Sequence, residues 1–189
     1  MNTDVRPGIS RALTSSRPSR ASVRTALAAV VLALLGTGLG VATPVAAHAA
    51  APAATAPAVA VQPAPGSPEA YLFTRVNQVR AQNGLAPLQY RARLAEVAET
   101  WSQEMARTRT LAHNPRISSL IEPGWTAWGE NVGYAGGYAD NAERIFTGWM
   151  NSSGHRANIL STRFTSIGIG AATDSRGYLW STQDFATYR

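Results

Sequence analysis

The stretch Phe164–Phe185, FTSIGIGAATDSRGYLWSTQDF, decides the fold class of this chain. Its first part, up to Ala172, is typical of a strand that keeps glycine where another backbone passes close. Asp174–Gly177 has the composition of a tight turn, and from Tyr178 to Phe185 the residues alternate with a period of two. The stretch therefore predicts a β-hairpin near the C-terminus.

Helical patterns precede this hairpin. Ser67 is a capping residue followed by a proline, and apolar residues then recur at helical spacing until Asn83–Gly84. Arg91–Arg109 carries one apolar stripe, formed by Leu94, Val97, Ala98, Trp101 and Met105.

Two further helices are predicted, one over Ile117–Ile121 and one from Asp140 to Trp149. The glycine-rich and aromatic segment between them, Gly124–Gly137, is assigned no element. Because helices come first and strands follow, the fold class is α+β, with helices packed on a small antiparallel sheet.

The beginning of the chain differs from a folded domain. Residues 1–24 hold five arginines and one acid, an apolar run follows at Thr25–Leu35, and small residues then lead to Ala47-His48-Ala49. This order is typical of a bacterial secretory signal peptide, which we assign to residues 1–49. An uncleaved membrane anchor is the alternative, but the apolar run is shorter than the ~20 residues that span a bilayer.

Residues 50–66 are rich in Ala and Pro and predict an extended linker, so the folded domain occupies residues 67–189. The net charge of the whole chain is +6, of which the arginine-rich start supplies the larger part. We therefore expect no nucleic-acid partner. The chain has no cysteine, so it has no disulfides and must be held together by its core.

Three polar residues of the domain stand out from their surroundings. His113 in LAHNP and His155 in SSGHRAN lie among Gly, Pro, Asn and Ser, away from any apolar helical stripe. Glu130 is an acid within the otherwise uncharged segment Gly124–Gly137. Each taken singly is more often a solvated loop side chain or a turn residue than part of a site.

The order of segments resembles the CAP superfamily, whose domain is also called SCP and which includes cysteine-rich secretory proteins, antigen 5 and plant pathogenesis-related 1 proteins. The bacterial secreted branch is the closer match. The resemblance covers about residues 68–186 and rests on seven pieces: VNQVRAQNGLAPLQY (76–90), RLAEVAETWSQEMA (93–106), LAHN (111–114), WGENVGY (128–134), WMNSSGHRANIL (149–160), IGIGAA (167–172) and YLWSTQDF (178–185).

The resemblance implies an α-β-α sandwich with a central antiparallel sheet, and a cavity lined by two histidines and two acids. His113 and His155 match the two histidines, and Glu130 matches the acid of the Gly-Glu-Asn motif. The second acid of eukaryotic members falls on Ser152, which is a departure from the family pattern. Asn131, beside Glu130, is expected to hydrogen-bond backbone near the cavity.

Two neutral imidazoles facing one cavity can bind a divalent metal such as Zn²⁺, with Glu130 as a direct or indirect ligand. With two or three protein ligands, binding would be loose and would weaken below about pH 6.5 as the imidazoles protonate. The alternative is a hydrogen-bonded His-Glu-His cluster that orients loops and holds no ligand.

Three kinds of function follow, and the sequence leaves open whether the protein is an enzyme. A secreted, monomeric binding module for a small molecule, lipid or cell-envelope ligand is favoured. A metal-dependent hydrolase or protease using His113, Glu130 and His155 is the alternative, and an envelope interaction module is the third. The aromatic residues suited to a binding surface, or to covering the core, are Trp125, Trp128, Tyr134 and Tyr138.

Overall fold

The computed structural model describes residues 8–9, 13–16 and 62–189, and all of these belong to one compact unit. The predicted domain, residues 67–189, is thus described in full. The apolar run of the predicted leader, and the linker up to residue 61, lie outside the described residues. No helix in the described ranges has both the length and the apolar character needed to cross a membrane.

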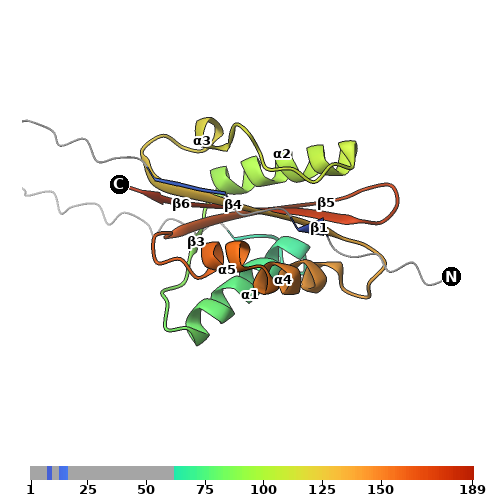
Figure 1. Ribbon diagram of the computed structural model, residues 1–189, viewed down its shortest axis with the longest axis horizontal. Coiled ribbons are helices and arrows are strands. Elements are labelled where there is room, and N and C mark those ends of the chain that lie inside the picture. Colours follow the sequence, from blue (N-terminus) through green and yellow to red (C-terminus); the bar gives the residue numbers. More distant parts are fainter. Residues whose placement is uncertain (1–7, 10–12, 17–61) are drawn as a thin grey trace, which may run out of the picture. The chain divides into compact units, whose positions relative to one another are not determined.

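A sheet forms the middle layer of this unit (Figure 1). Its strands follow the spatial order β1-β4-β6-β5-β3, and β2 also pairs with β4. Every pair is antiparallel except β3 with β5. The bounds are β1 Gly8–Ile9, β2 Leu13–Ser16, β3 Gln89–Tyr90, β4 Trp125–Ala135, β5 Ser166–Thr173 and β6 Leu179–Tyr188.

Helices cover both faces of the sheet, as the α-β-α sandwich requires (Figure 1). Helices α2 and α3 lie on one face, and α1, α4 and α5 lie on the other. The predicted sandwich is confirmed. The bounds are α1 Pro68–Gln82, α2 Ala92–Thr108, α3 Ile117–Leu120, α4 Asn141–Asn151 and α5 Ser153–Ile159.

The single parallel pair is a refinement of the predicted antiparallel sheet. Strand β3 is only two residues long, and the chain between it and β5 passes through four helices and β4. A tight hairpin forces antiparallel pairing, but so long a connection leaves either direction open. The hairpin of β5 and β6 is antiparallel, as its Asp174–Gly177 turn predicted.

The helix starts follow the local sequence closely. The Ser67 side chain accepts a hydrogen bond from the Ala70 N–H at 3.1 Å, and α1 begins at Pro68. Asp140 caps α4 in the same way, accepting from the Glu143 N–H at 2.9 Å. Each cap satisfies a backbone donor that the first turn leaves without a partner.

The apolar side chains form a core on each side of the sheet. On one side, the buried residues of α1, α4 and α5 contact β5 and β6, and they include Leu72, Val76, Ile145, Trp149, Ile159, Ile167 and Phe185. On the other side, α2 and α3 contact alternate residues of β4 and β6, with Leu94, Val97 and Ile117 near Ala186, and Met105 near Val132 and Trp180.

Two local predictions were wrong or incomplete. His155, whose neighbours Ser152, Ser153 and Gly154 are typical of a loop, lies on the short helix α5, Ser153–Ile159. Gly124–Gly137, for which the sequence predicts no element, contains β4, an eleven-residue strand. Its glycines and buried polar residues hide the alternation of a half-buried strand, since both faces of β4 are covered.

Two glycines of β5 bring α2 directly onto the sheet. A Cβ atom on Gly168 would overlap the backbone nitrogen of Ala95, and one on Gly170 would overlap that of Glu99. The close approach of another backbone, predicted from the IGIGAA sequence, is therefore confirmed, and the other backbone is that of α2.

We expect Gly170→Ala to lower the free energy of unfolding by about 1–3 kcal/mol or more, because the methyl group would push α2 away from β5. Urea unfolding followed by tryptophan fluorescence measures this. Gly133→Ala is the control in β4, since the nearest atoms to its methyl would be side-chain atoms, Trp149 Nε1 at 3.0 Å and Ile145 Cγ2 at 3.3 Å, rather than helix backbone within 2.5 Å. Equal losses in the two variants would contradict the helix-contact explanation.

Candidate functional site

The centre of the site is a histidine–carboxylate pair. His113 lies in the loop after α2, and its Nδ1 is 2.6 Å from Oε1 of Glu130 in β4. The carboxylate oxygen accepts, so Nδ1 carries the proton and the other ring nitrogen, Nε2, is left with its lone pair. The Glu130 side chain is fully buried, and that of His113 is 14% exposed.

The loop that carries His113 is anchored at several points. Helix α2 ends at Arg109 in the left-handed conformation, which turns the chain back along the helix. The Trp101 indole of α2 then donates to the Ala112 carbonyl at 2.8 Å. The backbone N–H of Asn114 donates to Glu130 Oε1 at 3.0 Å, so one carboxylate oxygen holds both the ring and its neighbour.

The second histidine is held by a hydroxyl. His155 lies buried on α5, and its Nδ1 is 2.8 Å from Oγ of Ser152. Ser152 is the last residue before α5, three positions earlier in the chain. The serine that stands where the family pattern has an acid therefore contacts the imidazole of His155.

Buried amides connect the two histidines. Asn131 donates through Nδ2 to the His155 carbonyl at 3.2 Å and to Gln183 Oε1 at 3.1 Å. Asn158 of α5 donates to the Glu130 carbonyl at 3.2 Å and to Asn131 Oδ1 at 3.0 Å. Asn131 thus bonds backbone near the site, as the sequence predicted.

The two imidazoles approach the sheet from different layers. Glu130 and Asn131 are consecutive in β4, so their side chains point to opposite faces, Glu130 toward the loop after α2 and Asn131 toward α5. His113 and His155 are nevertheless close enough for the charge of His113 to affect the pKa of His155. The structure therefore brings His113, Glu130, Asn131, Ser152 and His155 into one region.

Sequence reasoning missed one member of this region. Asp184 of β6 is directly opposite Glu130 of β4 in the strand register, and both residues are completely buried. Their carboxyl groups are within hydrogen-bonding reach of each other. The available signal was an acid in the middle of the hairpin strand Tyr178–Phe185, where the alternating pattern predicts burial.

Burial sets the protonation of these groups. It raises the pKa of Glu130, although the hydrogen bonds from His113 and Asn114 act in the other direction. Burial and then the charge of Glu130 raise the pKa of Asp184 well above its ordinary value, which favours the neutral acid, the form that can donate to Glu130. Burial, with a further effect of His113, lowers the pKa of His155 to about 4.

Several polar atoms of the region lack a hydrogen-bond partner in the part of the chain that the structure describes. They are Nε2 of His113 and His155, Oε2 of Glu130, Nε2 of Gln183, and both carboxyl oxygens of Asp184. A proton shared between Asp184 and Glu130 would account for Oε2 of Glu130 and one carboxyl oxygen of Asp184. The two imidazole nitrogens remain available for a ligand.

The described residues do not form a structural metal site. Across residues 62–189, no group of three or more His, Cys, Asp or Glu side chains is arranged to hold a metal ion. Glu130 already binds His113 Nδ1, so it orients that ring, as carboxylates do behind metal-binding histidines. A metal would be held by His113 and His155 through Nε2, with water completing its coordination.

Residues 73–185, more than half of the chain, match the family model CAP, the cysteine-rich secretory protein family. The chain belongs to the CAP family. Its His113–Glu130 pair and His155 thus lie in a CAP domain, and the resemblance found in the sequence is confirmed.

Two proteins of Bacillus subtilis (strain 168) resemble this CAP protein in sequence. The uncharacterized protein YkwD is 32% identical over 130 residues, which are 64% of this chain and 49% of YkwD. The uncharacterized membrane protein YlbC is 32% identical over 109 residues, or 54% of this chain and 31% of YlbC. The chain therefore spans about half of one relative and about a third of the other.

Solved structures agree on the fold. An extracellular protein containing an SCP domain from Bacillus anthracis is 26% identical, with a TM-score of 0.53 over 63% of this chain and 40% of that one. An outer surface protein from Borrelia burgdorferi has a TM-score of 0.55 over 63% of this chain and 91% of that one. At 17% identity, this second likeness shows the fold alone.

The aromatic residues in and directly after Gly124–Gly137 divide between core and surface. Trp125 and Trp128 are partly buried against the α2 side of the core. Tyr134 stacks on Trp180, with ring centroids 4.5 Å apart. Tyr138 is the exposed member, at 37%, and Arg144 lies over its ring. Three of the four thus contribute to packing, as their residue types predict.

We expect Asp184→Asn to raise the free energy of unfolding by about 1–4 kcal/mol near pH 8, with a smaller gain near pH 4. The unfolded carboxyl ionises near pH 4, but the folded one stays protonated, so folding takes up a proton and rising pH disfavours it. The amide can still donate to Glu130 and cannot ionise. Urea unfolding over a pH series measures the difference.

Asp174→Asn is the control, and its expected change in the free energy of unfolding has the opposite sign. Burial acts to raise the pKa of Asp174, but hydrogen bonds from Arg176, Tyr178 and Trp180 outweigh it and hold the pKa at about 2. This variant should be destabilised at neutral pH, and the loss should shrink as pH falls toward 2. A destabilised Asp184→Asn at pH 8 would show that Asp184 is ionised in the folded protein.

His155 should make the protein lose stability in acid. Because its folded pKa is about 4 and its ordinary value is 6.5, the unfolded chain binds the proton first, and stability falls as pH drops between these values. The loss is about 2–3 kcal/mol and should be absent in His155→Gln. Urea unfolding at pH 7 and pH 4 tests this, with Arg156→Gln, at an exposed position of the same helix, expected to keep the full loss.

Proposed function

We propose that this protein is exported from a bacterial cell and acts outside it as a CAP-domain binding module, whose ligand is held at the His113–His155 region. The proposal rests on how the imidazole rings of His113 and His155 are held. Each is fixed through Nδ1, His113 by Glu130 and His155 by Ser152, and each has an Nε2 without a partner among the described side chains. Because the rings are already held in place, binding a ligand through Nε2 would cost little conformational entropy.

Export is supported by the order of basic, apolar and small residues within positions 1–49. It is also supported by the likeness to a Bacillus anthracis protein described as extracellular. The Ala- and Pro-rich residues 50–66 would then hold the domain at a distance from the cell surface.

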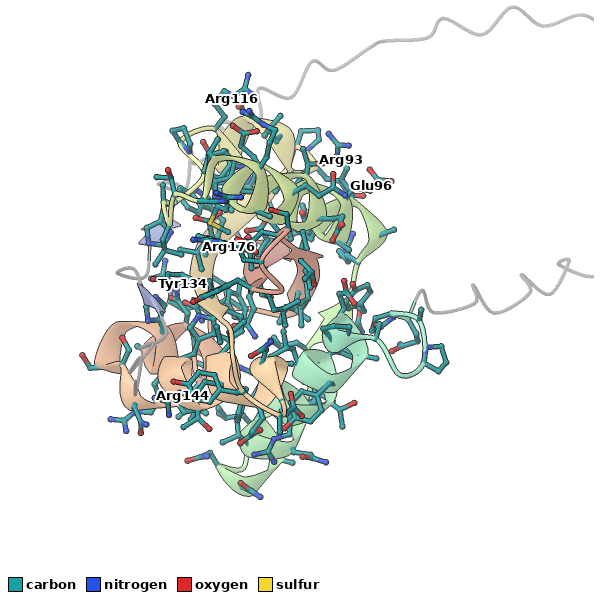
Figure 2. All side chains as sticks on the ribbon, turned by 90° about the vertical axis from the view of Figure 1, so that its right-hand side faces the viewer. Arg93, Glu96, Arg116, Tyr134, Arg144 and Arg176 are labelled. Atoms are coloured by element: carbon teal, nitrogen blue, oxygen red, sulfur yellow. The ribbon has the colours of Figure 1, made fainter. Side chains whose placement is uncertain are left out.

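A cleft on the α2 side of the domain offers room for a small ligand. It has a volume of about 730 Å³ and runs between α2 and the segment that continues from Asn114, which is the lining residue nearest in sequence to His113. Among the residues that line it, Arg93 and Glu96 lie next to each other, and Arg116 lies farther out on the same side of the sheet (Figure 2). Two of the guanidinium groups that line it pair with acids of the same cleft, Arg93 with Glu96 at 3.0 Å and Arg107 with Glu104 at 2.7 Å. Arg116 is the third arginine of the lining, and it could bind a carboxylate- or phosphate-bearing envelope ligand.

The hydrolase alternative would use the same imidazoles with an activated water. The contacts of Ser152 do not form a serine triad, because His155 has no acidic hydrogen-bond partner in the described part of the chain. Release of product from generic peptide substrates, measured with and without a chelator, would test for this activity.

A zinc titration of the exported protein tests the proposed site, with the protein purified without an oligohistidine tag. We expect Zn²⁺ to change the tryptophan fluorescence and to raise the unfolding temperature at micromolar to millimolar metal, because two imidazoles hold a cation only loosely. The double variant His113→Ala, His155→Ala should lose both responses.

Gln103→Ala is the control, since Gln103 lines the cleft from an exposed position and carries no metal-binding nitrogen. It should respond as the wild type does. If the double variant also responds like the wild type, the His113–His155 region is not the metal-binding site, and pull-down on peptidoglycan becomes the remaining test of binding.

A further inference from the structure

The strand that carries Glu130 has an unusual neighbour on its outer side. One edge of β4 pairs with β6 along its whole length. The other edge pairs antiparallel with β1, where Ile9 is opposite Gly133, and with β2, where Leu13 is opposite Glu130 and Ser16 is opposite Ala127. Both outer strands belong to residues 1–49, which the sequence predicts to be removed on export.

Removal of the leader would leave the outer edge of β4 open. Among the described strands, β1 and β2 are the ones that pair with this edge. Their pairing reaches from Ala127 to Tyr134, so export would uncover most of an eleven-residue strand. An open strand edge presents a row of backbone N–H and C=O groups that another extended chain can pair with.

This edge lacks the features that usually prevent such pairing. Proteins protect open edges with proline, with lysine or other charges, with bulges, or by keeping the strand short. The sequence of β4, WTAWGENVGYA, has no proline and no lysine. Its one charged residue is Glu130, which is buried and bound to His113. The irregularity in its pairing with β6 lies at the far end, between Trp125 and Ala127.

We propose that, in the exported protein, the outer edge of β4 from Ala127 to Tyr134 binds an extended peptide segment of another polypeptide as an added antiparallel strand. The proposal goes beyond the ligand site above and rests on the removal of the leader. Backbone hydrogen bonds supply most of the affinity in this kind of recognition. Because the edge offers no exposed charge, we expect the bound segment to be uncharged where it pairs.

The pairing in the structure specifies the occupant and its register. Short stretches of two and four residues, Gly8–Ile9 and Leu13–Ser16, are sufficient to form strands on this edge. A bound peptide in the same register would run opposite Gly129 and Glu130, on the strand that positions His113. The site for the peptide and the site for the small ligand would thus share β4.

Hydrogen exchange on the exported protein tests the proposal, after its first residue has been established by N-terminal sequencing. The probe is a synthetic peptide with the sequence of residues 8–16, GISRALTSS. We expect saturating peptide to slow the exchange of outward-facing amides of β4 between Ala127 and Tyr134 by about tenfold or more, with amides of α1 unchanged.

The control peptide carries Thr14→Pro and Ser15→Pro together. Of two neighbouring residues in an antiparallel strand, one points its N–H toward the partner, so the double replacement removes a pairing donor whichever residue it is. This peptide should give no protection. Protection by both peptides, or by neither, would overturn the proposal.

Two other outcomes would also overturn it. If the exported protein keeps residues 8–16, the edge has a permanent strand of its own. If the β4 amides are protected without peptide and sedimentation gives twice the monomer mass, a second copy occupies the edge. A zinc response that persists while the peptide fails to bind would separate the failure of this proposal from that of the metal-binding site.

Discussion

The contact between the backbone of α2 and the two glycines of β5 is the constraint on which the rest of the structure depends. Gly168 and Gly170 have no side chain to keep the helix at the usual distance, so α2 lies directly on the sheet. This contact between α2 and β5 has two consequences. The apolar stripe of α2 closes the core above β4 and β6. The end of α2 also comes to lie where its following loop can place His113 against Glu130. A helix raised by one methyl group would displace the histidine from the carboxylate that orients it.

The polar groups at the centre of the site are buried. They are arranged by β4, whose successive side chains point to opposite faces of the sheet. Glu130 points to the α2 side and Asn131 to the α5 side, so two consecutive residues of β4 contact the two histidines. Asp184 opposes Glu130 across the strand pair, and two buried carboxyl groups in contact cannot both be ionised at low energetic cost. The raised pKa of Asp184 favours its neutral form, which lowers this cost. Glu130 still accepts from Nδ1 of His113 through Oε1, so Nε2 is the ring nitrogen left without a partner among the described residues.

The position of β4 links three properties of the protein. It is the outermost long strand of the sheet, it carries the acid of the site, and its open side pairs with residues predicted to be removed during export. An edge strand with no exposed charge and no proline is prone to pair with other chains in an isolated domain. Its retention here is understandable if the edge has a partner outside the cell. The CAP scaffold would then offer two kinds of contact, one through side-chain nitrogens and one through backbone groups.

The sequence by itself determined the elements whose signals are local. The Ser67 and Asp140 caps, the apolar stripe of α2, the β5–β6 hairpin and the glycines that admit another backbone were all predicted, because each depends on residues a few positions apart. The resemblance to the CAP family supplied His113, Glu130 and His155. Only the tertiary structure decided that Gly124–Gly137 contains a strand, that His155 lies on a helix, and that Asp184 belongs to the site. These facts depend on which strand lies beside which, and burial on both faces of β4 removes the alternation from which a strand is recognised.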